Sequence, residues 1–166
     1  AAGEPPARAG YTPSVFAILP KLLERSGNSE KGSITAFYTI LVAGDDMNEP
    51  VSDEVRSILD GHIILSSELA RQGHYPAIDV LGSVSRILSN VTNEEHRKTI
   101  IQVREVLSNY KKIELLLRIG EYKPGSDKAA DFAIKFVEKV NRFLKQRVDE
   151  KCTLEETLNQ LQVLFR

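Results

Sequence analysis

This sequence has a single cysteine and no excess of charge of either sign. Cys152 is the single cysteine among 166 residues, so no disulfide can form within the chain. The 22 Lys and Arg nearly balance the 23 Asp and Glu, and the formal charge of -1 gives no general attraction to nucleic acid or anionic lipid. The longest stretch without a charged side chain, residues 32–44, is shorter than the roughly 18 residues that predict a membrane span. Without a signal-peptide pattern, the chain is expected in a reducing cytosol.

The common phosphate-binding and metal-binding motifs are missing as well. The sequence contains no G-x-x-x-x-G-K-[ST] loop, no G-x-G-x-x-G turn and no C-x-x-C pair, so nothing in it cradles a phosphate unaided. His62, His74 and His96 follow no common metal-ligand spacing, and we expect no metal site. Residues 44–50 hold three carboxylates and an Asn that could bind a divalent cation. We favour the more common alternative, a solvated loop between a strand and a helix.

The first nine residues read AAGEPPARA, with no initiator Met and with a Pro pair where a start would be. We therefore expect the chain to be a piece of a longer protein. Its composition, with 42% hydrophobic and 27% charged residues, is ordinary for a globular domain and excludes disorder over most of the length.

The first half of the chain has the pattern of an α/β protein. Thr12 followed by Pro13 predicts the start of a helix. Residues 33–42 are rich in β-branched and aromatic side chains with little polar alternation, which predicts a strand buried on both faces. A helical stretch over residues 53–59 and a second strand over 62–65 follow, and strand, helix, strand is typical of an α/β fold.

After about residue 90 the pattern becomes helical. A capping box of Thr92 and Glu95 predicts the start of a first amphipathic helix. A second helix is expected to begin near Asp127, and a third at the capping box of Thr153 and Glu156. The sequence thus predicts a small helical bundle behind an α/β layer.

Residues 73–86, GHYPAIDVLGSVSR, form the densest group of chemically capable side chains. They are typical of a loop at a sheet edge, where ligands of α/β proteins bind, and the guanidinium of Arg86 suits phosphate oxygens. A structural alternative is an exposed ion pair between Arg86 and Asp79, with Tyr75 as a core residue. Spacing alone leaves both interpretations open.

Several blocks of this sequence, in fixed order, resemble the carboxy-terminal part of the type III secretion ATPases, including the injectisome and flagellar export members. The blocks are GEPPARAGYTPSVFAILPKLLERSG, KGSITAFYTILVAGDDMNEP, RSILDGHIILS and HYPAIDVLGSVSR. More distantly they are similar to the catalytic subunits of rotary ATP synthases. The resemblance implies an α/β fold class, with the C-terminal part of a RecA-like nucleotide-binding core over residues 1–90 and an all-α helical domain over 91–166.

The resemblance also implies roles for particular residues. Arg86 matches the arginine finger, which reaches the γ-phosphate held by the neighbouring subunit. Tyr75 matches the aromatic residue that packs on adenine, and Phe143 a second aromatic of that pocket. Phe143 fits the apolar stripe of its helix equally well, so a core position stays open. ATP with Mg is implied as the cofactor, bound mainly by a phosphate loop and an acidic strand that the family carries upstream, so this chain alone is expected to be inactive.

The partners that the resemblance implies are those of a secretion machine. They are a homo-hexamer, a central stalk protein, a stator or regulator protein, and export chaperone-substrate complexes, at the cytoplasmic base of an inner-membrane apparatus and without nucleic acid. Residues 121–127 lie where rotary relatives carry an acidic loop for the stalk, but Lys123 dilutes the acidic character here. Two alternatives are a subunit of a rotary ATP synthase and a non-catalytic module that binds chaperones or the stalk.

Overall fold

The computed structural model describes residues 3–166, which form two compact units. Contacts divide the chain after His62, and the second unit runs from Ile63 to Arg166. The domain boundary between residues 90 and 91 stays a prediction. Ala1 and Ala2, the first residues of the predicted amino-terminal domain, lie outside the described residues.

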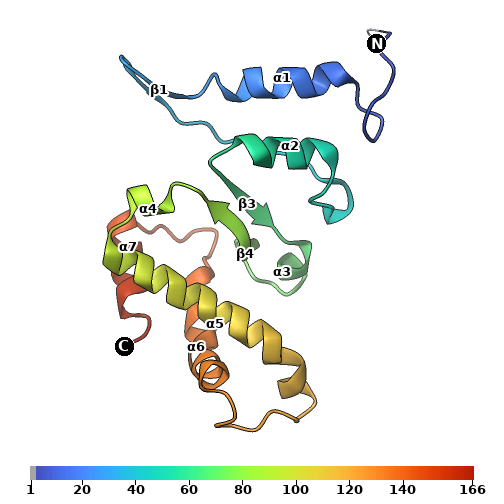
Figure 1. The fold of residues 1–166 in the computed structure, drawn as a ribbon. Coiled ribbons are helices and arrows are strands. Elements are labelled where there is room, and N and C mark those ends of the chain that lie inside the picture. The colour runs from blue at the N-terminus through green and yellow to red at the C-terminus, as the bar shows by residue number, and fades with distance from the viewer. Residues whose placement is uncertain (1–2) are drawn as a thin grey trace. The chain divides into compact units, whose positions relative to one another are not determined.

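The first unit combines helices with a short hairpin (Figure 1). Its elements are α1 (Pro13–Leu23), β1 (Gly27–Ser29), β2 (Gly32–Ile34), η1 (Ala43–Asp45) and α2 (Pro50–Ile58). α1 begins after Thr12 as predicted. α2 confirms the predicted helical stretch and starts earlier than expected, because Pro50 occupies its first turn and the Glu49 side chain accepts a hydrogen bond from the Ser52 N–H at 3.2 Å.

The buried strand predicted over residues 33–42 is wrong. β2 ends at Ile34 and pairs with β1 in an exposed antiparallel hairpin, and residues 35–42 form no regular element. The side chains of Phe37 and Leu41 are 89% and 93% exposed. A strand buried on both faces needs packing partners on each face, whereas no residue of this segment is buried and only Tyr38, Ile40 and Val42 are half-buried.

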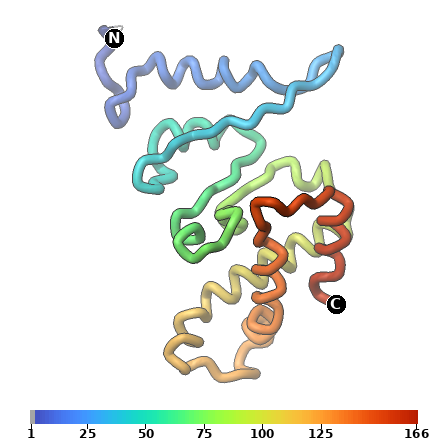
Figure 2. The backbone as a smooth tube through the Cα atoms, turned by 180° about the vertical axis from the view of Figure 1, so that it is seen from behind, coloured from blue at the N-terminus to red at the C-terminus, as the bar shows by residue number. Residues whose placement is uncertain are grey.

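The second unit contains the remaining elements and most of the buried residues. They are β3 (Gly61–Leu65), which begins two residues before it, α3 (Ser67–Arg71), β4 (Ile78–Ser85), α4 (Leu88–Val91), α5 (Glu94–Arg118), α6 (Lys128–Leu144) and α7 (Leu154–Val163). β3 confirms the strand predicted over residues 62–65 and pairs with β4 in a two-stranded sheet. α5 and α6 lie side by side, as both Figure 1 and the view from behind in Figure 2 show.

The start of α5 lies one residue from the predicted one. Asn93 is the N-cap, and its side chain accepts a hydrogen bond from the His96 N–H at 2.8 Å. The hydroxyl of Thr92 donates instead to the carbonyl of Leu88 in the preceding short helix. The predicted capping box of Thr92 and Glu95 is therefore wrong, because α4 takes the Thr92 hydroxyl and leaves the cap to Asn93.

The other two helix starts are confirmed. Asp127 caps α6 by accepting hydrogen bonds from the N–H groups of Ala129 and Ala130. α7 opens with the capping box of Thr153 and Glu156. The N–H of Thr153 donates to the Glu156 carboxylate at 2.8 Å, and this hydrogen bond lowers the pKa of that carboxyl below its usual range.

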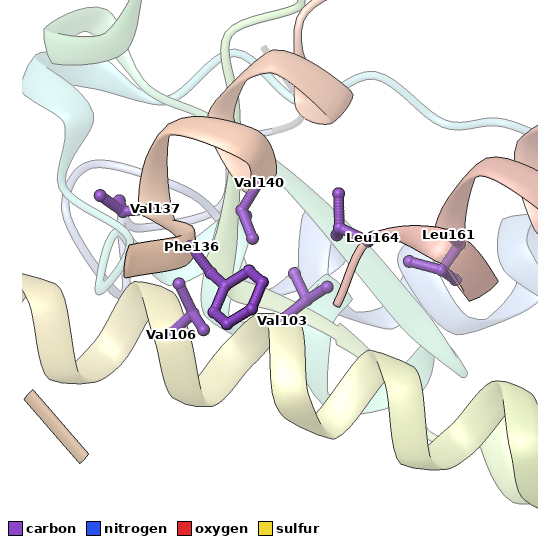
Figure 3. Close-up of a cluster of buried hydrophobic side chains, with 7 residues drawn as sticks. All are labelled: Val103, Val106, Phe136, Val137, Val140, Leu161 and Leu164. Atoms are coloured by element: carbon purple, nitrogen blue, oxygen red, sulfur yellow. The ribbon is translucent and has the colours of Figure 1, made fainter. Parts of the chain in front are cut away.

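α5, α6 and α7 share one apolar core (Figure 3). Its buried members are Val103, Val106, Phe136, Val137, Val140, Leu161 and Leu164. Phe136 lies beside the valines of α5, and its ring contacts Phe165 edge-on with 5.3 Å between the centroids. Helical spacing of apolar residues accounts for Val103, Phe136, Val140 and Leu161 in this core, whereas Leu154 at the start of α7 is 74% exposed.

Truncation of this core is expected to cost more stability than the same truncation at the surface. Val140 is 0% exposed, whereas Val148 is 106% exposed. Val140→Ala should lower the free energy of unfolding by about 2 kcal/mol, because two buried methyl groups are lost and a cavity remains. Val148→Ala should leave it within about 0.5 kcal/mol. Chemical denaturation followed by circular dichroism measures both, and equal effects would contradict this description of the core.

Candidate functional site

Residues 73–86 form a strand with short flanks, so the predicted loop is wrong. β4 occupies Ile78–Ser85, Tyr75 precedes it and Arg86 follows it directly. Arg86 is exposed, between the end of β4 and the start of α4. An aromatic residue thus precedes the strand, and an arginine follows it.

Besides its pairing with β3, the backbone of β4 is bound by side chains. Oδ1 of Asp79 accepts hydrogen bonds from the N–H groups of Leu81 and Gly82, each at 2.9 Å. The Ser83 hydroxyl donates to the Asp79 carbonyl at 2.6 Å and accepts from the Ile64 N–H of β3 at 3.0 Å. Asp79 therefore shapes its own strand. The ion pair between Asp79 and Arg86 stays a prediction.

Gly82 lies where a side chain has no room. A Cβ built on it would be 2.9 Å from Oδ2 of Asp79 and 3.1 Å from Cδ1 of Ile64. Any larger residue would push the Asp79 carboxylate away from the N–H groups that it binds. The letters DVLGS thus describe one local structure, in which Asp79 needs Gly82 beside it.

Arg104 of α5 binds the carbonyl groups of β4. Its Nη1 donates to the carbonyls of Val80 at 2.6 Å and Ser83 at 3.4 Å, and its Nη2 donates to the carbonyl of Leu81 at 3.0 Å. The flat guanidinium suits this task because its donors point in fixed, divergent directions. Arg104 therefore joins the strand to the helical part of the second unit.

Arg97, two turns earlier on the same helix, binds the segment beyond Arg86. Its Nη1 donates to the carbonyls of Ser89 at 2.7 Å and Thr92 at 3.0 Å. Neither arginine stands out in the sequence, since a basic residue on an amphipathic helix is typical of a solvated face. Their spacing of seven residues, which places them on one side of a helix, is the signal that could have shown that they act together.

Tyr75 lines an open groove of about 1000 Å³ at the end of α6. The groove is lined by Gly73, Tyr75, Glu138, Asn141, Arg142, Lys145 and residues 146–150. The Tyr75 side chain is 55% exposed, so the alternative of a core tyrosine is wrong. The carbonyl of Tyr75 accepts a hydrogen bond from the Gln146 N–H at 2.9 Å, which ties the aromatic residue to the segment after α6.

The groove beside Tyr75 carries charged side chains of both signs, namely Glu138, Asp149, Glu150, Arg142, Lys145 and Arg147. His74 is buried, and its pKa is lowered from the usual value, first by burial and then by the charge of Lys145. The neutral imidazole is therefore favoured at this position. Arg142 and Lys145 line the groove near Tyr75. An exposed aromatic ring that borders such a groove suits a planar ligand.

Phe143 is not among the residues that line the groove beside Tyr75. It packs, partly buried, against the core of α5, α6 and α7, whereas its neighbour Arg142 lines the groove. The structure therefore favours the core position that the helical stripe allowed. Its match to a second aromatic of an adenine pocket stays a prediction.

The acidic loop over residues 44–50 uses its side chains locally. Oδ1 of Asp46 accepts a hydrogen bond from the Asn48 N–H at 3.0 Å, and Glu49 caps α2. Across residues 3–166, no group of three or more His, Cys, Asp or Glu side chains could hold a metal ion. In that same range no helix is both long and apolar enough to cross a membrane.

Comparison with known proteins divides the chain between two family models. The nucleotide-binding domain of the ATP synthase alpha/beta family matches residues 1–85. The T3SS EscN ATPase C-terminal domain matches residues 92–163. A type 3 secretion system ATPase of Pseudomonas syringae pv. syringae is 55% identical over 161 residues, which are 97% of this chain and 36% of the relative. The chain thus spans about a third of the length of that relative.

Solved structures agree with both matches. The assembled ATPase EscN of the enteropathogenic E. coli type III secretion system superposes with a TM-score of 0.96 at 47% identity, over 99% of this chain and 40% of EscN. EscN in complex with its central stalk EscO superposes with a TM-score of 0.89 at 46% identity, over 99% of this chain and 39% of that one. The fold is therefore the C-terminal part of an ATP synthase-like core followed by a helical domain, as predicted. The chain belongs to the ATP synthase alpha/beta family, within its type III secretion ATPase branch.

Proposed function

We propose that this chain is the carboxy-terminal portion of a hexameric ATPase that energises type III protein secretion. ATP hydrolysis would be coupled to the release of chaperones and the unfolding of export substrates. The observation that carries the proposal is the position of Arg86. Its exposed guanidinium follows a strand whose backbone is bound by the side chains of Asp79 and Arg104.

Arg86 would act on ATP bound by the neighbouring subunit. Phosphoryl transfer spreads negative charge over the equatorial oxygens of the γ-phosphate, and a guanidinium supplied in trans stabilises that charge. A residue with this task must be exposed at the subunit surface and fixed in position, and Arg86 combines exposure with a rigid support on its strand. ATP with Mg would be held mainly by residues outside this chain.

Tyr75 would contact the adenine ring. Its half-exposed ring borders a groove with Arg142 and Lys145 nearby, and aromatic rings bind bases through their faces. The fit of this chain to adenosine nucleotide therefore rests on Tyr75 for the base and on Arg86 for the phosphate, each serving a different bound nucleotide.

The helical domain would meet the partners of the machine. EscN has been solved with its central stalk EscO, and this chain superposes on that complex over 99% of its length. By this likeness the central stalk is the first partner expected, with residues 121–127 as the connector nearest to it. A stator or regulator protein and chaperone-substrate complexes would bind the same hexamer at the cytoplasmic face of the inner membrane.

The arginine-finger role predicts a specific loss of turnover. In the full-length protein, Arg86→Ala should lower ATP hydrolysis by about 10³-fold or more and leave the dissociation constant for ATP nearly unchanged, because the guanidinium acts on the transition state. Arg118 is an exposed arginine paired with Glu114 on α5, and Arg118→Ala is the matched control with turnover near that of the wild type. Retained hydrolysis in Arg86→Ala would contradict the proposal.

The adenine role of Tyr75 predicts a loss of binding instead. Tyr75→Ala should weaken binding of ATP and ADP about tenfold, because the stacked ring is lost, whereas Tyr75→Phe should bind nearly as the wild type does. Titration with a fluorescent nucleotide measures both constants. If the Ala variant binds as tightly as the Phe variant, Tyr75 does not contact the base.

A further inference from the structure

Two arginines of α5 bind the chain on either side of Arg86. Arg104 donates to carbonyls at positions 80, 81 and 83, before Arg86, and Arg97 donates to carbonyls at positions 89 and 92, after it. Seven residues correspond to about two helical turns, so the two side chains leave the same face of α5. The short segment that carries Arg86 is therefore held at both ends by one rigid helix.

These contacts differ from ordinary surface hydrogen bonds. Arg97 and Arg104 are half-buried, whereas Arg118 of the same helix is exposed and pairs with Glu114. Their acceptors are backbone carbonyls, and a charged donor to a carbonyl makes a stronger bond than a neutral one. Because Arg104 binds three carbonyls, loss of its guanidinium would leave several strand acceptors without that donor at once.

α5 connects this segment to the helical core. One side of the helix presents Val103 and Val106 to α6 and α7, and another presents Arg97 and Arg104 to the segment around Arg86. A displacement of the helix within its bundle would thus be transmitted to the backbone beside Arg86. Packed helices move as rigid elements, so this coupling needs no change within the strand itself.

We propose that Arg97 and Arg104 are positioning residues for Arg86, and that through them the helical domain sets the reach of this guanidinium. The inference rests on the proposed function of Arg86 as an arginine finger. Neither positioning residue touches nucleotide; each fixes the backbone from which Arg86 extends. Misplacement of a catalytic group by about 1 Å can lower the rate about 100-fold, so such a support has a measurable kinetic effect.

A double-mutant cycle in the full-length protein tests the inference. Arg104→Met alone should lower kcat about 10-fold to 100-fold and change KM for ATP less than about twofold. Arg104→Lys should lose part of that rate, because a single ammonium cannot bind three carbonyls with fixed geometry. Arg118→Met, at the exposed arginine of the same helix, is the matched control and should change kcat less than about twofold.

The background of Arg86→Ala separates a positioning role from a structural one. If Arg104 acts through Arg86, adding Arg104→Met to Arg86→Ala should lower the remaining single-turnover rate less than about twofold. An equal fold-loss in both backgrounds would overturn the inference, because the arginine would then act independently of Arg86. Nucleotide titration and thermal unfolding of each variant confirm that the compared proteins are folded.

Arg97→Met provides an independent second variant, since its acceptors lie beyond Arg86. The same selective loss of kcat is expected, again absent in the Arg86→Ala background, and wild-type kcat in both Arg97→Met and Arg104→Met would overturn the inference. The failure of the proposed function looks different. If Arg86→Ala itself retains wild-type turnover, Arg86 is no finger, whatever the α5 variants do.

Discussion

The hydrogen bonds from Arg104 to β4 join the strand that precedes Arg86 to the helices that follow it. The strand has little sheet around it, and its carbonyl groups would otherwise need other partners. Arg104 of α5 supplies donors for these carbonyls. Asp79 accepts hydrogen bonds from N–H groups of β4, and the Ser83 hydroxyl binds the Asp79 carbonyl and the Ile64 N–H of β3. The strand therefore belongs by its contacts to the helices that follow it, within the unit that begins at Ile63.

The helices could be predicted from the sequence because their signals are local. Asp127 and Thr153 begin their helices as expected, since an N-cap needs only the N–H groups two or three residues ahead. The start of α5 lies one residue later than the sequence predicts, because the Thr92 hydroxyl donates to a carbonyl of α4 and Asn93 caps α5 instead. Apolar periodicity indicates much of the buried face of each helix, because burial of one face is what that pattern encodes, but it does not show that Leu154 is exposed.

The strands and the candidate site could be predicted only in part, since their environment is not local. Residues 33–42 have the composition of a buried strand, yet burial depends on neighbours that no pattern within the segment specifies. The exposure of Arg86 agrees with both interpretations of its segment, but that segment is a strand and not the expected loop. The role of Arg104 could not be predicted, because nothing in its sequence neighbourhood shows that it binds carbonyl groups of β4.

Co-assembly of two inactive variants shows whether Arg86 completes a site on the next subunit. One variant carries Arg86→Ala, and the other has an intact Arg86 but a disabled phosphate loop in the upstream part of the protein. Mixed hexamers contain interfaces in which an intact loop faces an intact Arg86, so the account predicts hydrolysis well above that of either variant alone. No gain on mixing, in hexamers shown to contain both variants, would contradict action in trans.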